Sequence, residues 1–266
     1  MLSLHFTAPH WPWQGNNAKG RAESERILER DRLAAEGAEA SGLHIAHYDG
    51  GDMQTYADMV TSLDMNVGRV LSRLAQLGME QDTVVVFTSD NGGERFSYNW
   101  PFTGIKTELL EGGIRVPFII KWPGLAAPGS VSDSPILTMD MLPTFLAAAG
   151  GAPHPDYPTD GIDIRPALTG NHLPERPLYW RFHSKDQRAA RLGDYKYLKI
   201  NDNEYLFNIT EDPLERGNLA QRMPDMFEKL KAAHAQWDAQ MLPDPGDVSS
   251  FGWSPRELAD HYGWND

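Results

Sequence analysis

The sequence predicts an α/β protein in which a parallel sheet covered by helices precedes a small antiparallel sheet. Residues 55–77 carry apolar side chains at steps of three and four, which is the pattern of an amphipathic helix. Residues 83–88 form a continuous apolar, β-branched run, which is typical of a strand buried on both faces. Because a helix that leads into such a strand is half of a βαβ unit, these segments favour a parallel core. After residue 178 the pattern changes to short alternating stretches, which indicate antiparallel strands.

The N-terminal elements are predicted from similar local signals. Residues 1–6 have the pattern of a strand, which we expect to lie parallel to the strand over residues 83–88. Residues 13–52 form an insertion whose middle is rich in Glu, Arg and Ala, and we assign it no chemistry. Gly78 is expected to end the helix over residues 55–77 as its C-cap.

The rest of the chain divides into a continuation of the core and a separate small sheet. We expect a strand over residues 118–120, a helix over 138–149 and a surface loop over 152–166. These belong to a first domain over residues 1–170, and residues 171–266 form an antiparallel subdomain with a helix and a polar tail. The subdomain elements are expected as strands at 178–182, 189–192, 195–200 and 204–209, a hairpin turn at 201–203 and a helix over 225–241.

Composition argues against several classes of function. The 266 residues include 37 acidic and 24 basic side chains, and the net charge of −13 argues against general affinity for nucleic acid or anionic lipid. No apolar run is long enough to span a bilayer. Cysteine is absent, which excludes disulfides, zinc–thiolate sites and a thiol nucleophile within these residues. The first residues lack the basic and apolar regions of a signal peptide, and the sequence leaves the compartment open.

A candidate metal site follows the predicted strand over residues 83–88. Asp90 and Asn91 come directly after it, at the end of the strand where ligands bind in open α/β sheets. Their carboxylate and carboxamide supply hard oxygen ligands suited to Ca²⁺ or Mg²⁺. Gly92 and Gly93 let the backbone turn sharply beside them. On these residues alone an ordinary Asp-Asn-Gly-Gly turn is the more frequent explanation, so both interpretations stay open.

Two further groups are candidates for chemistry on an anion. His10 lies between two prolines at the end of the first predicted strand, so its backbone is stiff and its imidazole is a candidate proton donor or acceptor. If the two strands are parallel, His10 and Asp90 emerge at the same edge of the sheet. Lys106 and Arg115 follow in a loop, where a cation beside a metal would neutralise an oxyanion substrate. For Arg115 we favour a structural ion pair with Glu111, and for Lys106 the alternative is a solvated loop lysine.

Several motifs together carry a resemblance to a known family. The segments FTSDNGG (87–93), GIK (104–106) and EGGIRVP (111–117) occur in an order and spacing similar to the sulfatase family. The PHWP segment at residues 9–12 resembles that family's proline–histidine strand end. The helix over residues 55–77 also fits, as do four later segments: DMLPT (140–144), DGID (160–163), RLGDYK (191–196) and LFN (206–208). The resemblance covers nearly the whole chain except the insertion and the tail.

The resemblance implies an alkaline-phosphatase-like α/β fold and hydrolysis of sulfate monoesters. In this family a formylglycine made from Cys or Ser attacks sulfur, and two N-terminal aspartates with an Asp-Asn pair bind a divalent cation, usually calcium. By position, Asp90 and Asn91 match that pair as metal ligands. Lys106 matches the family's sulfate-binding lysine, and His10 matches the histidine that assists departure of the alcohol. The resemblance thus implies calcium, with magnesium also possible, and a sulfated small molecule or sulfated carbohydrate as substrate.

The chain also departs from the family pattern. The C/S-x-P-x-R nucleophile motif, the N-terminal aspartate pair, the early lysine and the second histidine have no counterpart here. We therefore expect residues 1–170 to be the later part of the catalytic domain, with the formylglycine in a preceding segment and no turnover by this chain alone. The alternatives are a phosphate or phosphonate monoester hydrolase of the same superfamily, and a non-catalytic truncated scaffold. The sequence does not identify the ester or the oligomeric state.

Overall fold

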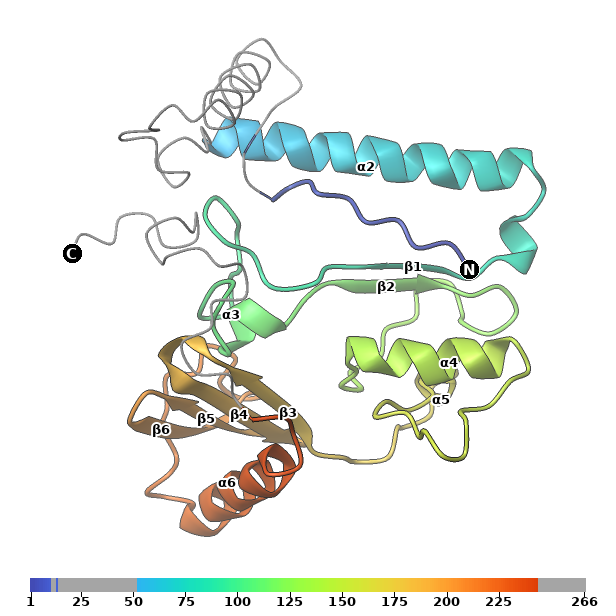
Figure 1. Cartoon of the computed structure of the whole chain (residues 1–266). Coiled ribbons are helices and arrows are strands. Elements are labelled where there is room, and N and C mark those ends of the chain that lie inside the picture. The colour runs from blue at the N-terminus through green and yellow to red at the C-terminus, as the bar shows by residue number, and fades with distance from the viewer. Residues whose placement is uncertain (11–12, 14–51, 244–266) are drawn as a thin grey trace, which may run out of the picture.

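The computed structural model describes residues 1–10, Trp13 and residues 52–243 of the chain (Figure 1). The predictions for most of the insertion over residues 13–52 and for the polar tail lie outside the described residues. The elements are α2 (Met53–Gln76), η2 (Glu80–Asp82), β1 (Val85–Thr88), α3 (Glu111–Ile114), β2 (Phe118–Lys121), η3 (Thr138–Asp140), α4 (Met141–Ala148), α5 (Arg165–Leu168), β3 (Leu178–Phe182), η4 (Ser184–Asp186), β4 (Gln187–Leu192), β5 (Tyr195–Ile200), β6 (Asn203–Asn208) and α6 (Pro224–Asp238).

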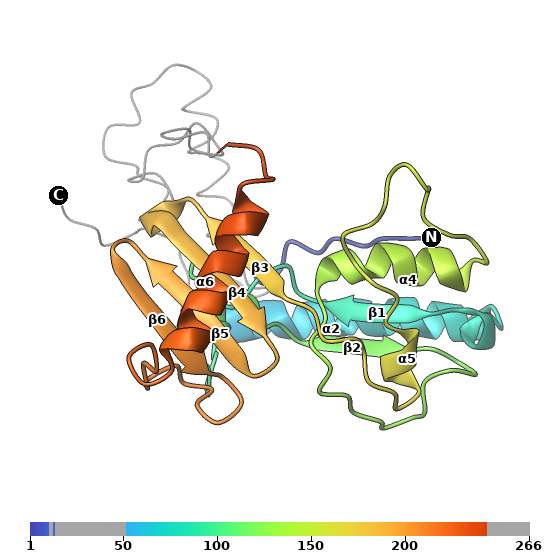
Figure 2. The same cartoon turned by 90° about the horizontal axis from the view of Figure 1, so that it is seen from below.

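The elements form two neighbouring units. The two-stranded sheet β1–β2 lies between α2 on one side and α4 with α5 on the other (Figure 1). The four-stranded sheet β3–β6 lies beside this unit, with α6 across one of its faces (Figure 2). The predicted α/β class, with a small antiparallel sheet near the C-terminus, is confirmed. Within the described ranges, no helix is long and apolar enough to cross a membrane.

Helix α2 forms where the sequence predicts it. Asp52 caps its start, because the Asp52 carboxylate accepts a hydrogen bond from the Thr55 backbone N–H at 2.7 Å. Gly78 follows the helix with a φ of 68°, a left-handed conformation that glycine adopts without strain. Thr55 and Met59 are its buried residues, so most of the apolar stripe on α2 is partly exposed.

The pairing of β1 differs from the prediction. Strand β1 pairs antiparallel with β2, with Val85 opposite Lys121 and Thr88 opposite Phe118. Residues 1–6 form no strand, and they are an exposed, extended segment that runs in the same direction as β1 (Figure 1). The predicted parallel strand at residues 1–6 is therefore wrong, and so is the prediction that β1 is buried on both faces. An apolar, β-branched run favours the strand conformation, but it does not specify which segment will pair with that strand.

The segment between β2 and β3 is organised by a buried carboxylate. Asp140 is fully buried and accepts backbone hydrogen bonds from Leu137 at 2.8 Å and from Ile162 at 2.9 Å, and it also pairs with Arg176. The helix predicted over residues 138–149 is observed as η3 followed by α4. The loop predicted over residues 152–166 is observed up to the start of α5 at Arg165, but it is not wholly on the surface, because Gly161 and Ile164 are buried.

The C-terminal sheet closely follows the prediction. Strands β3 to β6 are antiparallel and adjacent in chain order, and the predicted turn contains Asn201 with a φ of 50°. Helix α6 covers one face, where Ala190, Tyr197, Leu206 and Leu230 form a buried cluster. This cluster gives the subdomain a core of its own.

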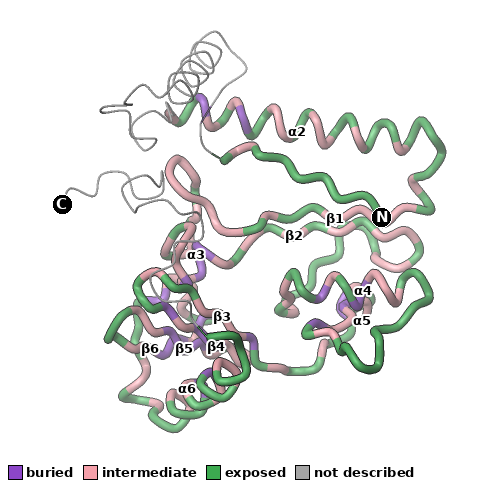
Figure 3. The backbone as a smooth tube through the Cα atoms, viewed as in Figure 1, coloured by how far each residue is buried: buried purple, intermediate pink, exposed green. Residues whose placement is uncertain are grey.

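The opposite face of the same sheet supports the loop that contains α3. Leu109 from this loop is buried with Ala189, Leu198, Phe207 and Ile209 from the sheet and its exit. Figure 3 shows buried residues gathered around α3 and the strands beneath it. The loop that carries Lys106 is therefore anchored to the C-terminal sheet by apolar packing.

Candidate functional site

Asp90 and Asn91 lie at the carboxyl end of β1, as predicted. Asp90 is exposed and Asn91 is half-buried. The Asp90 carboxylate accepts a hydrogen bond from the Asn91 backbone N–H at 3.0 Å, and the Ser89 hydroxyl donates to the Asn91 carbonyl at 2.9 Å. These local bonds are those of a tight turn, and they leave the second oxygen of the exposed Asp90 carboxylate accessible to solvent or to a ligand.

Hydrogen bonds tie this turn to the loop that carries Lys106. The Gly92 N–H donates to the Gly113 carbonyl at 2.8 Å, and the Lys106 N–H donates to the Gly93 carbonyl at 3.1 Å. Asn99 reinforces the connection, because its Nδ2 donates to the carbonyls of Gly93 at 2.8 Å and Gly104 at 3.2 Å. The candidate metal ligands and the lysine loop therefore form one connected unit.

His10 and Lys106 are in contact across this unit. The His10 Nε2 atom lies 2.9 Å from the Lys106 Nζ atom, although 96 residues separate them in the chain. An ammonium can only donate, so the imidazole nitrogen is the acceptor in this contact. The backbone N–H of His10 donates a hydrogen bond to the Thr7 carbonyl at 2.8 Å, which forms a tight turn just before the histidine. The structure thus brings together the two residues that were predicted to act on the substrate.

A buried ion cluster holds the other end of the loop. The Lys196 ammonium is fully buried and lies 2.9 Å from a carboxylate oxygen of Glu111 and 2.9 Å from one of Glu215. The other Glu215 oxygen accepts a hydrogen bond from the Glu111 N–H at 2.6 Å. Burial raises the pKa of Glu215, while the nearby Lys196 charge acts to lower that pKa. Arg115 lies 3.5 Å from Glu111, so its predicted structural ion pair is confirmed.

Sequence reasoning missed the supporting residues Lys196, Glu215 and Asn99. Lys196 lies inside a quoted motif, RLGDYK, but a lysine in an alternating strand gives no signal of burial between two carboxylates. Glu215 and Asn99 lie in loops where polar residues are expected. Only the three-dimensional arrangement identifies them.

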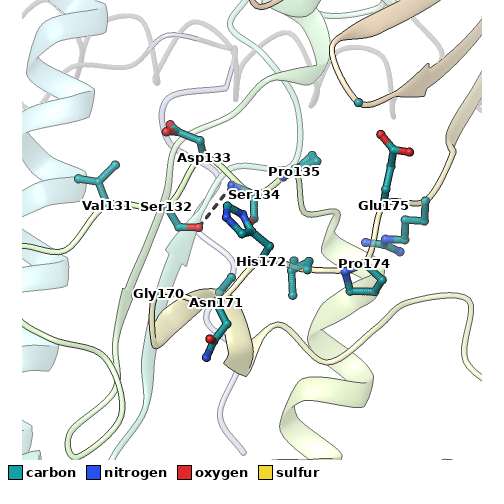
Figure 4. A pocket seen from close by; sticks show the side chains of 14 residues that line it. Val131, Ser132, Asp133, Ser134, Pro135, Gly170, Asn171, His172, Pro174 and Glu175 are labelled. Atoms are coloured by element: carbon teal, nitrogen blue, oxygen red, sulfur yellow. Dashed lines mark hydrogen bonds between the residues drawn. The ribbon is translucent and has the colours of Figure 1, made fainter.

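A separate hollow of about 420 Å³ lies away from these residues. It is lined mainly by residues 131–135 and 170–176 (Figure 4). None of His10, Asp90, Asn91 or Lys106 lines it. The described residues also contain no group of three His, Asp or Glu side chains that could hold a metal ion.

Comparisons with known proteins identify the family. The family profile described as Sulfatase matches residues 1–152, and the profile described as N-sulphoglucosamine sulphohydrolase, C-terminal, matches residues 105–240. The chain is 40% identical to N-acetylgalactosamine-6-sulfatase of Canis lupus familiaris over 147 residues, which is 53% of this chain and 28% of that protein. It is 40% identical to steryl-sulfatase of Mus musculus over 249 residues, which is 75% of this chain and 40% of that protein.

Solved structures give the same result. The crystal structure of Ps i-CgsB matches with a TM-score of 0.72 and 28% identity, over 87% of this chain and 48% of that one. Ps i-CgsB has also been solved in complex with k-i-k-neocarrahexaose. The chain therefore spans about half or less of the length of these relatives. Because the Sulfatase profile covers more than half of its residues, the chain belongs to the sulfatase family, whose members share the alkaline-phosphatase-like fold.

Proposed function

We propose that this chain is the sulfate-binding part of an enzyme that hydrolyses sulfate monoesters. The observation that carries the proposal is the 2.9 Å contact between His10 and Lys106, on a loop bonded to the Asp90–Asn91 turn. Membership of the sulfatase family supports sulfate as the anion. The net charge of −13 would repel an anionic substrate, so a local cation is needed where the sulfate binds.

Lys106 and His10 have complementary roles in the proposed reaction. The Lys106 ammonium binds a sulfate oxygen and stabilises the negative charge that grows there in the transition state. His10, after its Nε2 atom has taken up a proton from Lys106 or from water, donates that proton to the oxygen of the departing alcohol, which an alkyl leaving group requires more than an aryl one. In the free site the His10 imidazole accepts a hydrogen bond from Lys106, so substrate must separate or bridge the two groups.

We propose Asp90 and Asn91 as ligands of calcium, with magnesium as the alternative. Their carboxylate and carboxamide oxygens are the hard ligands that these ions prefer, and the exposure of Asp90 leaves room for an ion. Calcium takes six to eight oxygens, so other segments or water must supply the rest. A bound cation would neutralise sulfate charge, and a formylglycine in a preceding segment would supply the nucleophile.

We propose a sulfated carbohydrate as the substrate class. One relative at 40% identity is an N-acetylgalactosamine-6-sulfatase, and Ps i-CgsB was solved with k-i-k-neocarrahexaose bound. Because another relative is a steryl-sulfatase, a steryl sulfate is the alternative substrate to compare with a sulfated carbohydrate.

The test compares ester classes with the protein expressed from its full coding sequence. We expect turnover of aryl and sugar sulfates, little turnover of steryl sulfate, and loss of activity with a chelator that calcium restores. Preferential turnover of phosphate or phosphonate monoesters would overturn the assignment to sulfate. His10→Ala should slow an alkyl or sugar sulfate more than an activated aryl sulfate, because the activated leaving group needs less protonation.

The 266-residue chain alone provides a second comparison. It should bind calcium weakly, because only two side-chain ligands are proposed from it, and it should not turn over an aryl sulfate. Tight, stoichiometric calcium binding measured by calorimetry would contradict the proposed ligand set.

A further inference from the structure

Thr107, the residue after Lys106, has an unusual backbone conformation. Its φ is 73°, in the left-handed region. A β-branched residue rarely adopts this conformation, because its side chain crowds the backbone, so the surrounding structure must hold it there. The turn at Thr107 sets how the segment that ends in Lys106 is oriented relative to Leu109, which is buried against the C-terminal sheet. In this orientation the Lys106 ammonium lies 2.9 Å from the His10 Nε2 atom.

Gln187, the first residue of β4, supplies the restraint. Its side chain is fully buried, and its Nε2 donates to the Thr107 carbonyl at 2.9 Å. Its Oε1 accepts from the Leu109 N–H at 2.9 Å, so the carboxamide is bonded both at the turn and beyond it. Nε2 also donates to the Ser184 carbonyl at 3.0 Å. Both amide protons and the amide oxygen are therefore used on backbone groups.

A neighbouring contact reaches the other side of Lys106. The Lys185 ammonium lies 3.5 Å from one oxygen of Glu108, whose other oxygen accepts from the Ile105 N–H at 3.3 Å. The segment over residues 184–187 thus restrains the backbone both before and after Lys106. Lys185 itself has a left-handed φ of 58°, so backbone strain is found on both sides of this contact.

We propose that Gln187 is a positioning residue for Lys106. By holding the left-handed turn at Thr107, Gln187 aims the Lys106 ammonium toward His10 and the bound sulfate. The inference rests on the sulfate-binding role proposed above for Lys106. It assigns to the C-terminal sheet a part in catalysis through the geometry of the lysine loop.

The test uses the full-length enzyme with Gln187→Met, Thr107→Gly and the double variant. Methionine keeps the side-chain volume but removes all three hydrogen bonds. We expect Gln187→Met to lower kcat for an aryl sulfate about a hundredfold, the effect of a small misplacement of a reacting group. Adding Thr107→Gly to Gln187→Met should raise kcat about tenfold or more above that of Gln187→Met alone, because glycine adopts a positive φ without help from neighbouring side chains. If Gln187→Met does not fold, Gln187→Glu takes its place in the test. Glutamate keeps the oxygen that accepts from Leu109 but lacks the amide protons that are donated to Thr107 and Ser184.

Asn218→Leu is the matched control. Asn218 is also a carboxamide that braces the backbone of this sheet, accepting from Leu206 and Ala220 at 3.0 Å each. It makes its contacts away from the lysine loop. Asn218→Leu should lower the melting temperature while leaving kcat near the wild-type value. Adding Thr107→Gly should not change the effect of Asn218→Leu on either quantity.

Two results would overturn the proposal. One is a Gln187→Met enzyme with normal kcat when Lys106→Ala is inactive, and the other is a double variant as slow as Gln187→Met alone. If Lys106→Ala keeps its turnover, the proposed sulfate-binding role is the part that fails. In that case the restraint of Thr107 by Gln187 is tested in the 266-residue chain. Gln187→Met must lower the melting temperature less in a Thr107→Gly background than in the wild-type background.

Discussion

At the residue scale, the contact between His10 and Lys106 shows which parts of a site a sequence can reveal. Both residues could be named beforehand, because each occurs in a short motif whose order and spacing resemble the sulfatase family. The sequence placed His10 and Asp90 at one sheet edge through a parallel pairing of two strands, and His10 contacts Lys106 at 2.9 Å although residues 1–6 form no strand. Gln187 and Asn99 could not be named, because a carboxamide that bonds to backbone groups leaves no periodic or spacing signal. The candidate site residues were therefore easier to name from the sequence than the residues that support them.

Glycine at position 92 allows the close approach of the two loops. A Cβ atom at Gly92 would lie 1.8 Å from the Gly112 carbonyl oxygen, so alanine must push the loops apart and break the bond from Gly92 to Gly113. We expect Gly92→Ala to lower the free energy of unfolding by roughly 1–3 kcal/mol. The matched control is Gly68→Ala in α2, where the added methyl meets nothing within 4 Å and should stabilise the helix by up to about 1 kcal/mol.

Urea denaturation of both alanine variants measures these two effects. Equal effects of the two substitutions on the unfolding midpoint would show that the approach of the loops does not depend on glycine.

At the element scale, local patterns predicted the elements better than their partners. Helices α2 and α6 and strands β3 to β6 lie within a few residues of their predicted bounds, because period and turn residues are local signals. The antiparallel pairing of β1 with β2 was missed, because pairing depends on contacts between distant segments. The ion cluster of Glu111, Lys196 and Glu215 is also such a contact, and it joins α3 to β5.

This cluster predicts a specific dependence of stability on pH. Burial raises the pKa of Glu215 above its ordinary value of 4.5, so the folded state binds this proton more tightly than the unfolded state does. The resulting stabilisation is fully present below about pH 4.5 and is lost as pH rises through the folded-state pKa. Glu215→Gln cannot ionise, so its free energy of unfolding should fall less than that of the wild type as pH rises from 4.5 to 7.

Urea unfolding at several pH values in this range measures the difference. Glu211→Gln, which changes an exposed carboxylate outside the cluster, should follow the wild-type curve. A Glu215→Gln curve parallel to that of the wild type would contradict the raised pKa.

At the scale of the whole molecule, the C-terminal sheet supports the loop that carries Lys106. One face of this sheet packs on α6 and the other on the lysine loop, so the subdomain has a core of its own and also holds the candidate site. The fold class followed from the family resemblance and from the change of pattern near residue 178. The arrangement joins the loop that carries Lys106 by hydrogen bonds to the Asp90–Asn91 turn, in a chain of net charge −13.

The central claim is that Lys106 binds the sulfate group of the substrate. The most direct measurement is kcat/KM of the full-length protein for an aryl sulfate, with Lys106→Ala compared with Lys121→Ala. Lys121 is an exposed lysine on β2 that pairs with Glu80 at 3.2 Å, so it controls for the loss of a surface charge. We predict that Lys106→Ala lowers the rate about a hundredfold to a thousandfold, or roughly 3–4 kcal/mol, with little change in melting temperature. We predict near-normal kinetics for Lys121→Ala. Equal rates for the two variants would contradict the claim that Lys106 binds sulfate, and so would a loss of activity in Lys106→Ala that only follows unfolding.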